Sequence, residues 1–265
     1  MLIVLQTPTR RIYKRTVRPG FKLRITRTSG PPIHHLLTSA NTTACLNFFT
    51  WNKAYSIFPQ HTLVQHRFYP LKFPNDEFGS TLNELADQGW SARDIVWPDL
   101  AGAEICKIQG LRRVGGSSTM VILLNTDSVR AAAVPDSEIE YAQFDVLGAD
   151  ARDNPLRGSQ RSLMLYSRVL KIHAEKNASA AMRHDFITGH PGWQAYLRDR
   201  LRRWAWLEFY KLRPEDRPHL SGTAHPLHSE LSLPQNFRTP PSWDYADDAI
   251  PVWYKEWEQT GNGHH

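Results

Sequence analysis

The longest helical pattern of the chain, from Trp193 to Leu212, constrains the fold more than any other feature. Its apolar residues recur every three or four positions, which is the spacing of one face of an α-helix. The members of this series are Leu197, Leu201, Trp204 and Leu207. Helical backbone is disfavoured before a proline, so Arg213 and Pro214 are expected to end the helix. Other elements must cover its apolar face.

Shorter β patterns precede this helix. Residues 21–27 alternate strictly between apolar and polar, and Pro19-Gly20 before them is a turn signal. Together they predict a β-hairpin over residues 9–28. The spacing in this hairpin is expected to place apolar residues on one face and basic residues on the other.

A second hairpin is predicted around Gly115-Gly116-Ser117, because residues 105–114 and 118–124 on either side are rich in strand-forming residues. In this hairpin residues 120–124 are expected to form a buried strand. Residues 139–147 predict a further strand.

Two more helices are predicted, over residues 80–89 and 162–176. In the first, Ser80 is expected to cap the helix and Gly89 to end it. Residues 42–58 contain a cluster of aromatic residues and fit either a helix or a buried pair of strands. The sequence leaves these two alternatives open.

These patterns predict an α+β protein with two unlike halves. Residues 1–150 form a basic half that is rich in β-hairpins and holds short helices. Residues 151–265 form a helical half with the long basic amphipathic helix and an irregular coil rich in Pro and Trp. Seven prolines lie between residues 214 and 251, so this coil is expected to wrap over the surface. The wrap favours one cooperative domain over two separate ones.

Charge is strongly segregated along the chain. The first acidic residue is Asp76, and the 75 residues before it contain eleven Lys or Arg. This stretch therefore carries +11, and the remaining 190 residues carry −5, since the whole chain carries +6. A surface without carboxylates attracts polyanions. The candidate phosphate-binding residues of the first hairpin are Arg11, Arg15, Arg18, Lys22, Arg24 and Arg27.

The long helix adds a second basic set, in which aromatic residues lie among the cations. Its candidate nucleic-acid-binding residues are Arg198, Arg202 and Arg203. The same pattern is typical of a helix on an anionic membrane, or of an ordinary helix with one solvated basic face. The hairpin also has an alternative interpretation, in which its charges pair with the acidic C-terminal segment. The acids of that segment are Asp244, Asp247, Asp248, Glu256 and Glu258.

Signals for catalysis or metal binding are sparse. His225, His228 and Glu230 are suitable ligand types, but Pro226 prevents the helix that would align the two histidines, so no metal and no cofactor are expected. His184-Asp185 is a candidate acid–base pair. On a strand, Asp136, Glu138 and Glu140 would share one face and suit a divalent ion. Motifs for nucleotide binding, and those of serine hydrolases and kinases, are missing.

The expected function is non-catalytic binding of an acidic partner, with RNA or a nucleoprotein as the leading candidate. One alternative is an enzyme with a dispersed His/Asp/Glu site in residues 184–230. The other is a protein–protein interaction module whose basic face binds an acidic protein. No transmembrane segment is predicted. Cys45 and Cys106 fit reduced thiols, so an intracellular location is expected, cytoplasmic or nuclear, with mitochondria as the alternative because the N-terminal stretch is rich in Arg.

Overall fold

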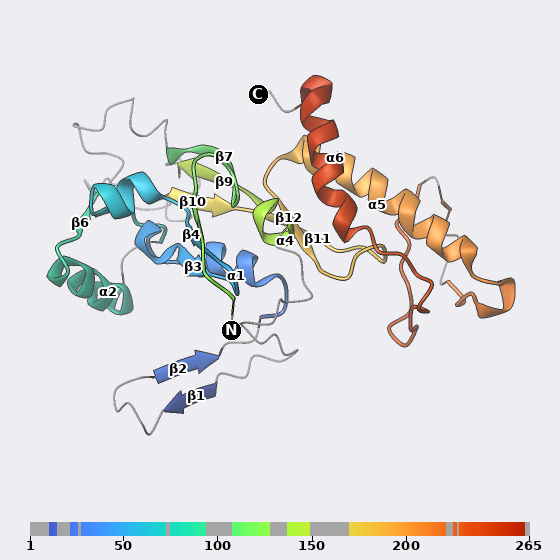
Figure 1. The fold of residues 1–265 in the computed structure, drawn as a ribbon, viewed down its shortest axis with the longest axis horizontal. Helices are drawn as coiled ribbons and strands as arrows, with labels where there is room; N and C mark the ends of the chain where they lie inside the picture. Colours follow the sequence, from blue (N-terminus) through green and yellow to red (C-terminus); the bar gives the residue numbers. More distant parts are fainter. Residues whose placement is uncertain are drawn as a thin grey trace, which may run out of the picture.

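The computed structural model describes residues 11–14, 22–25, 28–72, 75–93, 108–127, 137–148, 170–220, 225–226 and 228–262. Several small sheets and a set of helices make up this part of the chain, which confirms the α+β class (Figure 1). The helices are α1 (Pro32–Ser39), α2 (Asp76–Asp87), α4 (Ser137–Glu140), α5 (Pro191–Lys211) and α6 (Ile250–Trp257). Short turns of 3-10 or π type are Thr43–Cys45, Gln60–Val64, Pro214–Asp216, Asp247–Ala249 and Glu258–Asn262.

The strands are short. They are β1 (Arg11–Lys14), β2 (Lys22–Ile25), β3 (Asn47–Phe49), β4 (Lys53–Ser56), β5 (Arg67–Phe68), β6 (Ser91–Ala92), β7 (Gly110–Arg113), β8 (Met120–Leu123), β9 (Gln143–Gly148), β10 (Leu170–His173), β11 (Glu175–Asn177) and β12 (Phe186–Thr188). Within residues 42–58 the chain therefore forms the strand pair β3–β4, which decides between the two alternatives left open by the sequence.

Two antiparallel three-stranded sheets have the orders β10-β9-β7 and β3-β4-β8, and all their strands except β10 come from the first half. Their buried side chains meet those of α1 in a first hydrophobic core. Central members of this core are Leu37, Leu46, Ile57, Ile108, Val114, Phe144, Val146 and Leu170.

The predicted second hairpin is wrong, because its two strands pair with different partners. β7 pairs with β9, and β8 pairs with β4 in the other sheet. The ladder between β7 and β9 continues past Arg113, since Val114 N donates to Ala142 O and Gly115 N donates to Glu140 O. Gly115 also lies so close to Glu140 that a Cβ atom would be 2.8 Å from the Glu140 side chain. This packing directs the chain away from β7 after the turn.

β8 is also not the buried strand that its sequence indicates. Only β4 pairs with it among the described strands, so it lies at a sheet edge. Val121, Ile122, Leu123 and Leu124 are all exposed, and Leu123 is 76% exposed. An uninterrupted apolar run predicts burial only where other elements cover both faces of the strand. Here the first core is complete without these side chains.

Two predicted helix positions need correction. α2 begins four residues before the predicted start, because Asn75 is its cap and its side chain accepts a hydrogen bond from Phe78 N at 2.8 Å. Phe78 is buried and anchors the first turn. The predicted end is close to the observed one, and Gly89 has a φ of +79° that suits a helix terminus.

The predicted helix over residues 162–176 is wrong in its described part, because β10 and β11 occupy residues 170–173 and 175–177. Burial alternates along β10, with Leu170 buried and Lys171 exposed, as expected for a strand and not for a helix. The predicted strand over residues 139–147 is correct only from Gln143 onward, since Ser137–Glu140 form α4.

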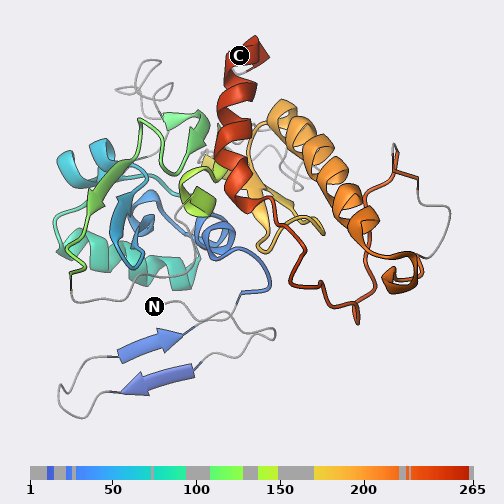
Figure 2. The same cartoon turned by 45° about the vertical axis from the view of Figure 1, so that its right-hand side comes forward.

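α5 confirms the long helix and dominates the second half. Its buried face runs through Trp193, Leu197, Leu201 and Ala205, whereas Leu207, predicted on this face, is 65% exposed. α6 packs beside α5 (Figures 1 and 2), and the Trp204 and Trp253 ring centroids lie 5.8 Å apart across the two helices. α5, α6 and the coil between them form most of a second hydrophobic core. The large side chains of this second core are Phe186, Trp193, Trp206, Phe209, Trp243, Trp253, Tyr254 and Trp257.

β12 connects the two cores. Phe186 belongs to the second core, and its neighbour Ile187 belongs to the first. Successive side chains of a strand point to opposite faces, so one short strand serves both cores. β12 also packs against β9, the central strand of its sheet. Division into domains at residue 150 stays a prediction.

We predict that stability falls between pH 10 and pH 12 because of Tyr254. Burial, aided by the Glu258 carboxylate, raises the pKa of Tyr254 to about 12. In the unfolded chain the phenol ionises near pH 10, so in this window the folded state binds more protons and the free energy of unfolding decreases. The loss approaches roughly 2–3 kcal/mol. Urea denaturation of the parent and of Tyr254→Phe checks this, since the variant must lose this part of the pH dependence.

Candidate functional site

The basic hairpin predicted from the sequence is present. β1 and β2 pair antiparallel, and the register places Lys14 opposite Lys22 and Ile12 opposite Arg24. In both Figure 1 and Figure 2 the hairpin lies at the far end of the molecule from α6. Arg15, Arg18 and Arg27 lie outside the described residues, as do the side chains of Arg11, Lys22 and Arg24.

The candidate arginines of α5 have partners inside the protein. Arg198 Nε donates to Asn177 Oδ1 at 3.2 Å. Arg202 and Arg203 both pair with Asp199 one turn earlier, and the Arg203 contact is 2.8 Å long. Arg203 is nevertheless 71% exposed, so its pair is a surface pair of low strength. α5 is therefore less available to a polyanion than its composition suggests.

The acidic C-terminal segment also binds α5. Glu256 Oε2 lies 2.9 Å from Arg200 Nη2 and accepts from the Tyr196 hydroxyl at 3.2 Å. At the other end of the helix, Asp244 Oδ2 lies 3.0 Å from Lys211 Nζ. These pairs tie the returning coil and α6 to the helix.

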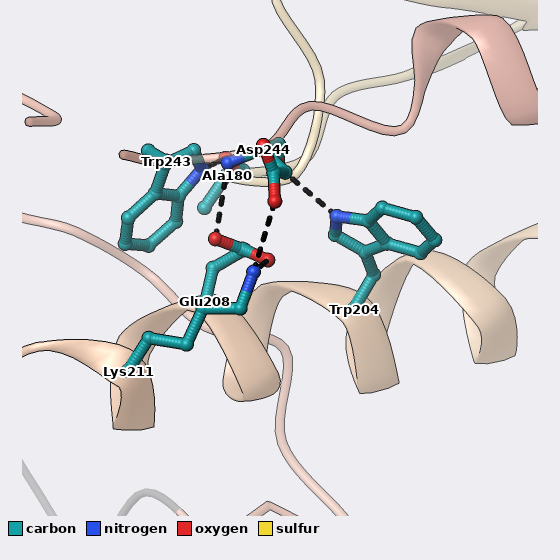
Figure 3. A network of polar contacts seen from close by, with 6 residues as sticks. All are labelled: Ala180, Trp204, Glu208, Lys211, Trp243 and Asp244. Carbon is teal, nitrogen blue, oxygen red and sulfur yellow. Dashed lines mark hydrogen bonds and ion pairs between the residues drawn. The ribbon is translucent and has the colours of Figure 1, made fainter. Parts of the chain in front are cut away.

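Figure 3 shows the second of these contacts as part of a network centred on the buried Glu208. One Glu208 oxygen accepts from Asp244 N at 3.0 Å, and the other accepts from Lys211 Nζ at 2.6 Å. The Glu208 and Asp244 carboxylates raise the pKa of Lys211. Trp204 Nε1 donates to Asp244 O, and Trp243 Nε1 donates to Ala180 O. Both oxygens of the buried Glu208 carboxylate thus have a hydrogen-bond donor, one from the coil that crosses α5 and one from α5 itself.

These contacts bear on the interpretation that the C-terminal acids neutralise the basic hairpin. Within the described residues, Asp244 and Glu256 pair with α5, and Asp247 accepts from the backbone of Arg183 and His184. Three of the five acids are therefore engaged with segments other than β1 and β2.

His225, His228 and Glu230, the possible metal ligands named from the sequence, do not lie together as one group. The His225 and His228 rings stack with their centroids 5.3 Å apart. Glu230 instead lines a small cavity of about 30 Å³ together with Arg198 and Arg202. A cavity of this size has room for a water molecule or two but not for an organic substrate.

A different triad is the one group of three such ligand types found within the described residues. It consists of Glu138 from α4, His184 from the loop before β12 and Asp247 from the turn before α6, with one ligand atom of each within 4.8 Å of the others. His184 Nδ1 lies 2.7 Å from Glu138 Oε1 and 3.6 Å from Asp247 Oδ1. Burial raises the pKa of Glu138; the neighbouring His184 opposes this shift and Asp247 adds to it.

All three members of this triad stand out in the sequence, but each was expected in a different group, with Asp247 among the C-terminal acids. Glu138 was expected on a strand with Asp136 and Glu140, yet it lies on a helical turn. His184 was expected to act with Asp185. Asp247 follows His184 by 63 residues, and no local pattern connects the two. Only the packing of the returning coil brings them together.

Comparison with models of protein families, with curated proteins and with solved structures finds no match for this chain. Among the helices that the structure describes, none has the length and apolar character needed to cross a membrane.

Proposed function

We propose that this protein binds a polyanion, RNA or a nucleoprotein, through its basic N-terminal region and without catalysing a reaction. The observation that carries the proposal is the charge segregation, with +11 before the first acidic residue. Arginine and lysine without neighbouring carboxylates attract phosphate groups over about a Debye length, roughly 10 Å at 0.1 M salt. RNA as the partner also implies an intracellular location.

The engagement of the C-terminal acids supports the proposal. Asp244, Asp247 and Glu256 are used by α5 and by the segment around His184, so their described partners lie in the second half of the chain. The register of the hairpin adds support, because Lys14 lies opposite Lys22. Like charges at one pair position are destabilising, and a bound anion offsets this cost.

α5 has a smaller part in the proposed interface. Arg198 and Arg202 are engaged with Asn177 and Asp199, whereas Arg203 keeps most of its side chain exposed. We therefore assign the main phosphate contacts to the hairpin cations and a weaker contact to the exposed face of α5.

Binding to labelled single-stranded RNA should weaken steeply with added salt, because each neutralised phosphate releases counterions. The double substitution Lys22→Gln and Arg24→Gln removes two cations of the hairpin. We expect it to make the slope of log K against log salt shallower by about 1.4, since each contact on a single strand contributes about 0.7. Fluorescence anisotropy between 50 and 300 mM salt measures this slope.

The matched control removes two exposed cations that lie outside both the hairpin and α5, by Arg238→Gln and Lys255→Gln. Its net charge equals that of the hairpin variant, so a purely global charge effect would change both slopes equally. A slope change confined to the hairpin variant supports the proposal. No binding at 50 mM salt, or equal changes in the two variants, contradicts it.

A further inference from the structure

We infer that Glu138, His184 and Asp247 form a binding site for a divalent transition-metal ion of the zinc type. The three side chains come from three separate segments: α4 of the first half, the loop before β12, and the turn that leads into α6. Metal–ligand distances of about 2.0–2.2 Å place neighbouring ligand atoms of one ion about 3–3.5 Å apart. The distances of 2.7 and 3.6 Å from His184 Nδ1 to the two carboxylates bracket this range.

The Glu138 carboxylate provides an independent indication. Its side chain is only 16% exposed, and its buried Oε1 lies 2.7 Å from His184 Nδ1. Buried polar atoms are nearly always partnered, and here the close partner is another potential metal ligand. A shared cation would accept a lone pair from each of the two atoms in place of their direct contact.

Asp247 and His184 are held in position by backbone contacts. The Asp247 carboxylate accepts from Arg183 N at 3.0 Å and from His184 N at 3.3 Å. The adjacent Ala246 N donates to Ala181 O at 2.8 Å, which clamps the two segments together. Oδ1 accepts from both of these donors, whereas Oδ2 accepts only from Arg183 N and so keeps a lone pair for an ion. Hydrogen bonds of this kind orient metal ligands and strengthen binding.

The ligand types select the class of ion. One imidazole nitrogen with two carboxylate oxygens suits Zn²⁺, Mn²⁺ or Fe²⁺ better than Mg²⁺, which prefers oxygen ligands alone, and affinity is greater for Zn²⁺ than for Mn²⁺. The His184 side chain is 44% exposed, so the ion has a path from solvent and can keep a water ligand. A bound ion would join the first half to the second.

The test is zinc titration by calorimetry, with H264A and H265A as the background so that the C-terminal histidines do not contribute. We expect one Zn²⁺ per chain and a higher melting temperature with zinc. E138Q and H184Q should each weaken binding at least about tenfold and abolish the thermal shift. H225A with H228A is the matched control, because it removes two histidines outside the triad and should leave zinc affinity unchanged.

Circular dichroism of E138Q and H184Q without zinc verifies that both variants fold. Three outcomes would overturn the inference: no saturable binding near a 1:1 ratio, binding that persists in both triad variants, or binding that disappears in the control. In each of these cases the triad is a polar contact among two carboxylates and the His184 side chain. Neither result affects the RNA slope, so this site and the proposed function are tested separately.

Discussion

Replacing Trp193 with alanine is expected to lower the free energy of unfolding by about 3–5 kcal/mol, as for other large aromatic residues removed from a core. Trp193 is fully buried in the first turn of α5. Its ring lies 5.2 Å from Tyr254 and 5.6 Å from Trp257, centroid to centroid. The alanine variant leaves a cavity between α5 and α6 that these rings cannot fill without losing their own contacts.

Urea denaturation with linear extrapolation measures this effect. Leu207→Ala is the matched control on the same helix, because Leu207 is largely exposed, and should change stability by less than about 0.5 kcal/mol. Trp193→Phe should cost much less than alanine, since it keeps most of the ring volume and removes a buried Nε1 that has no hydrogen-bond partner. A loss below about 1 kcal/mol in Trp193→Ala contradicts this packing.

Replacing Gly189 with alanine should also destabilise the protein strongly. A Cβ atom at this position would lie 2.7 Å from the Phe144 carbonyl carbon and 2.8 Å from its Cα. Phe144 is buried in β9, the central strand of the β10-β9-β7 sheet, so its backbone cannot move without disturbing both neighbours. We expect a loss of about 3 kcal/mol, at the upper end of the cost of overpacking.

Gly79→Ala is the control for this substitution. Gly79 lies inside α2, and a Cβ atom there would meet nothing within 4 Å. Alanine in an open helical position should stabilise the protein by about 0.5–1 kcal/mol. The two Gly→Ala changes should therefore have opposite signs in the same denaturation experiment. A neutral result for Gly189→Ala would mean that β12 does not pack against β9 as described.

Local patterns predicted some elements correctly. The apolar series Leu197, Leu201, Trp204 and Leu207 predicted α5, because such spacing is typical of one face of a helix, although Leu207 proved to be exposed. The alternation after Phe21 likewise predicted β2 and its antiparallel partner β1. In both cases the signal lies within one segment and needs no knowledge of distant residues.

Local patterns failed where a distant element decided the outcome. The glycines after Val114 favoured a hairpin, but hydrogen bonds to Ala142 and Glu140 gave β7 a different partner from β8. The apolar run in β8 favoured burial, yet the first core closes without it. Local patterns favoured Ser80 as the cap of α2, but Asn75 caps it because the buried Phe78 fixes where the first turn lies.

The α+β class, the basic hairpin, the long helix and the charge segregation could be predicted from local patterns, since each depends on the period or the composition of one stretch. The strand pairing, the engagement of α5 by the C-terminal acids, and the meeting of Glu138, His184 and Asp247 became visible only in the packed fold. These contacts join segments tens of residues apart, so no local pattern encodes them. Their geometry is set by how two hydrophobic cores pack around β12.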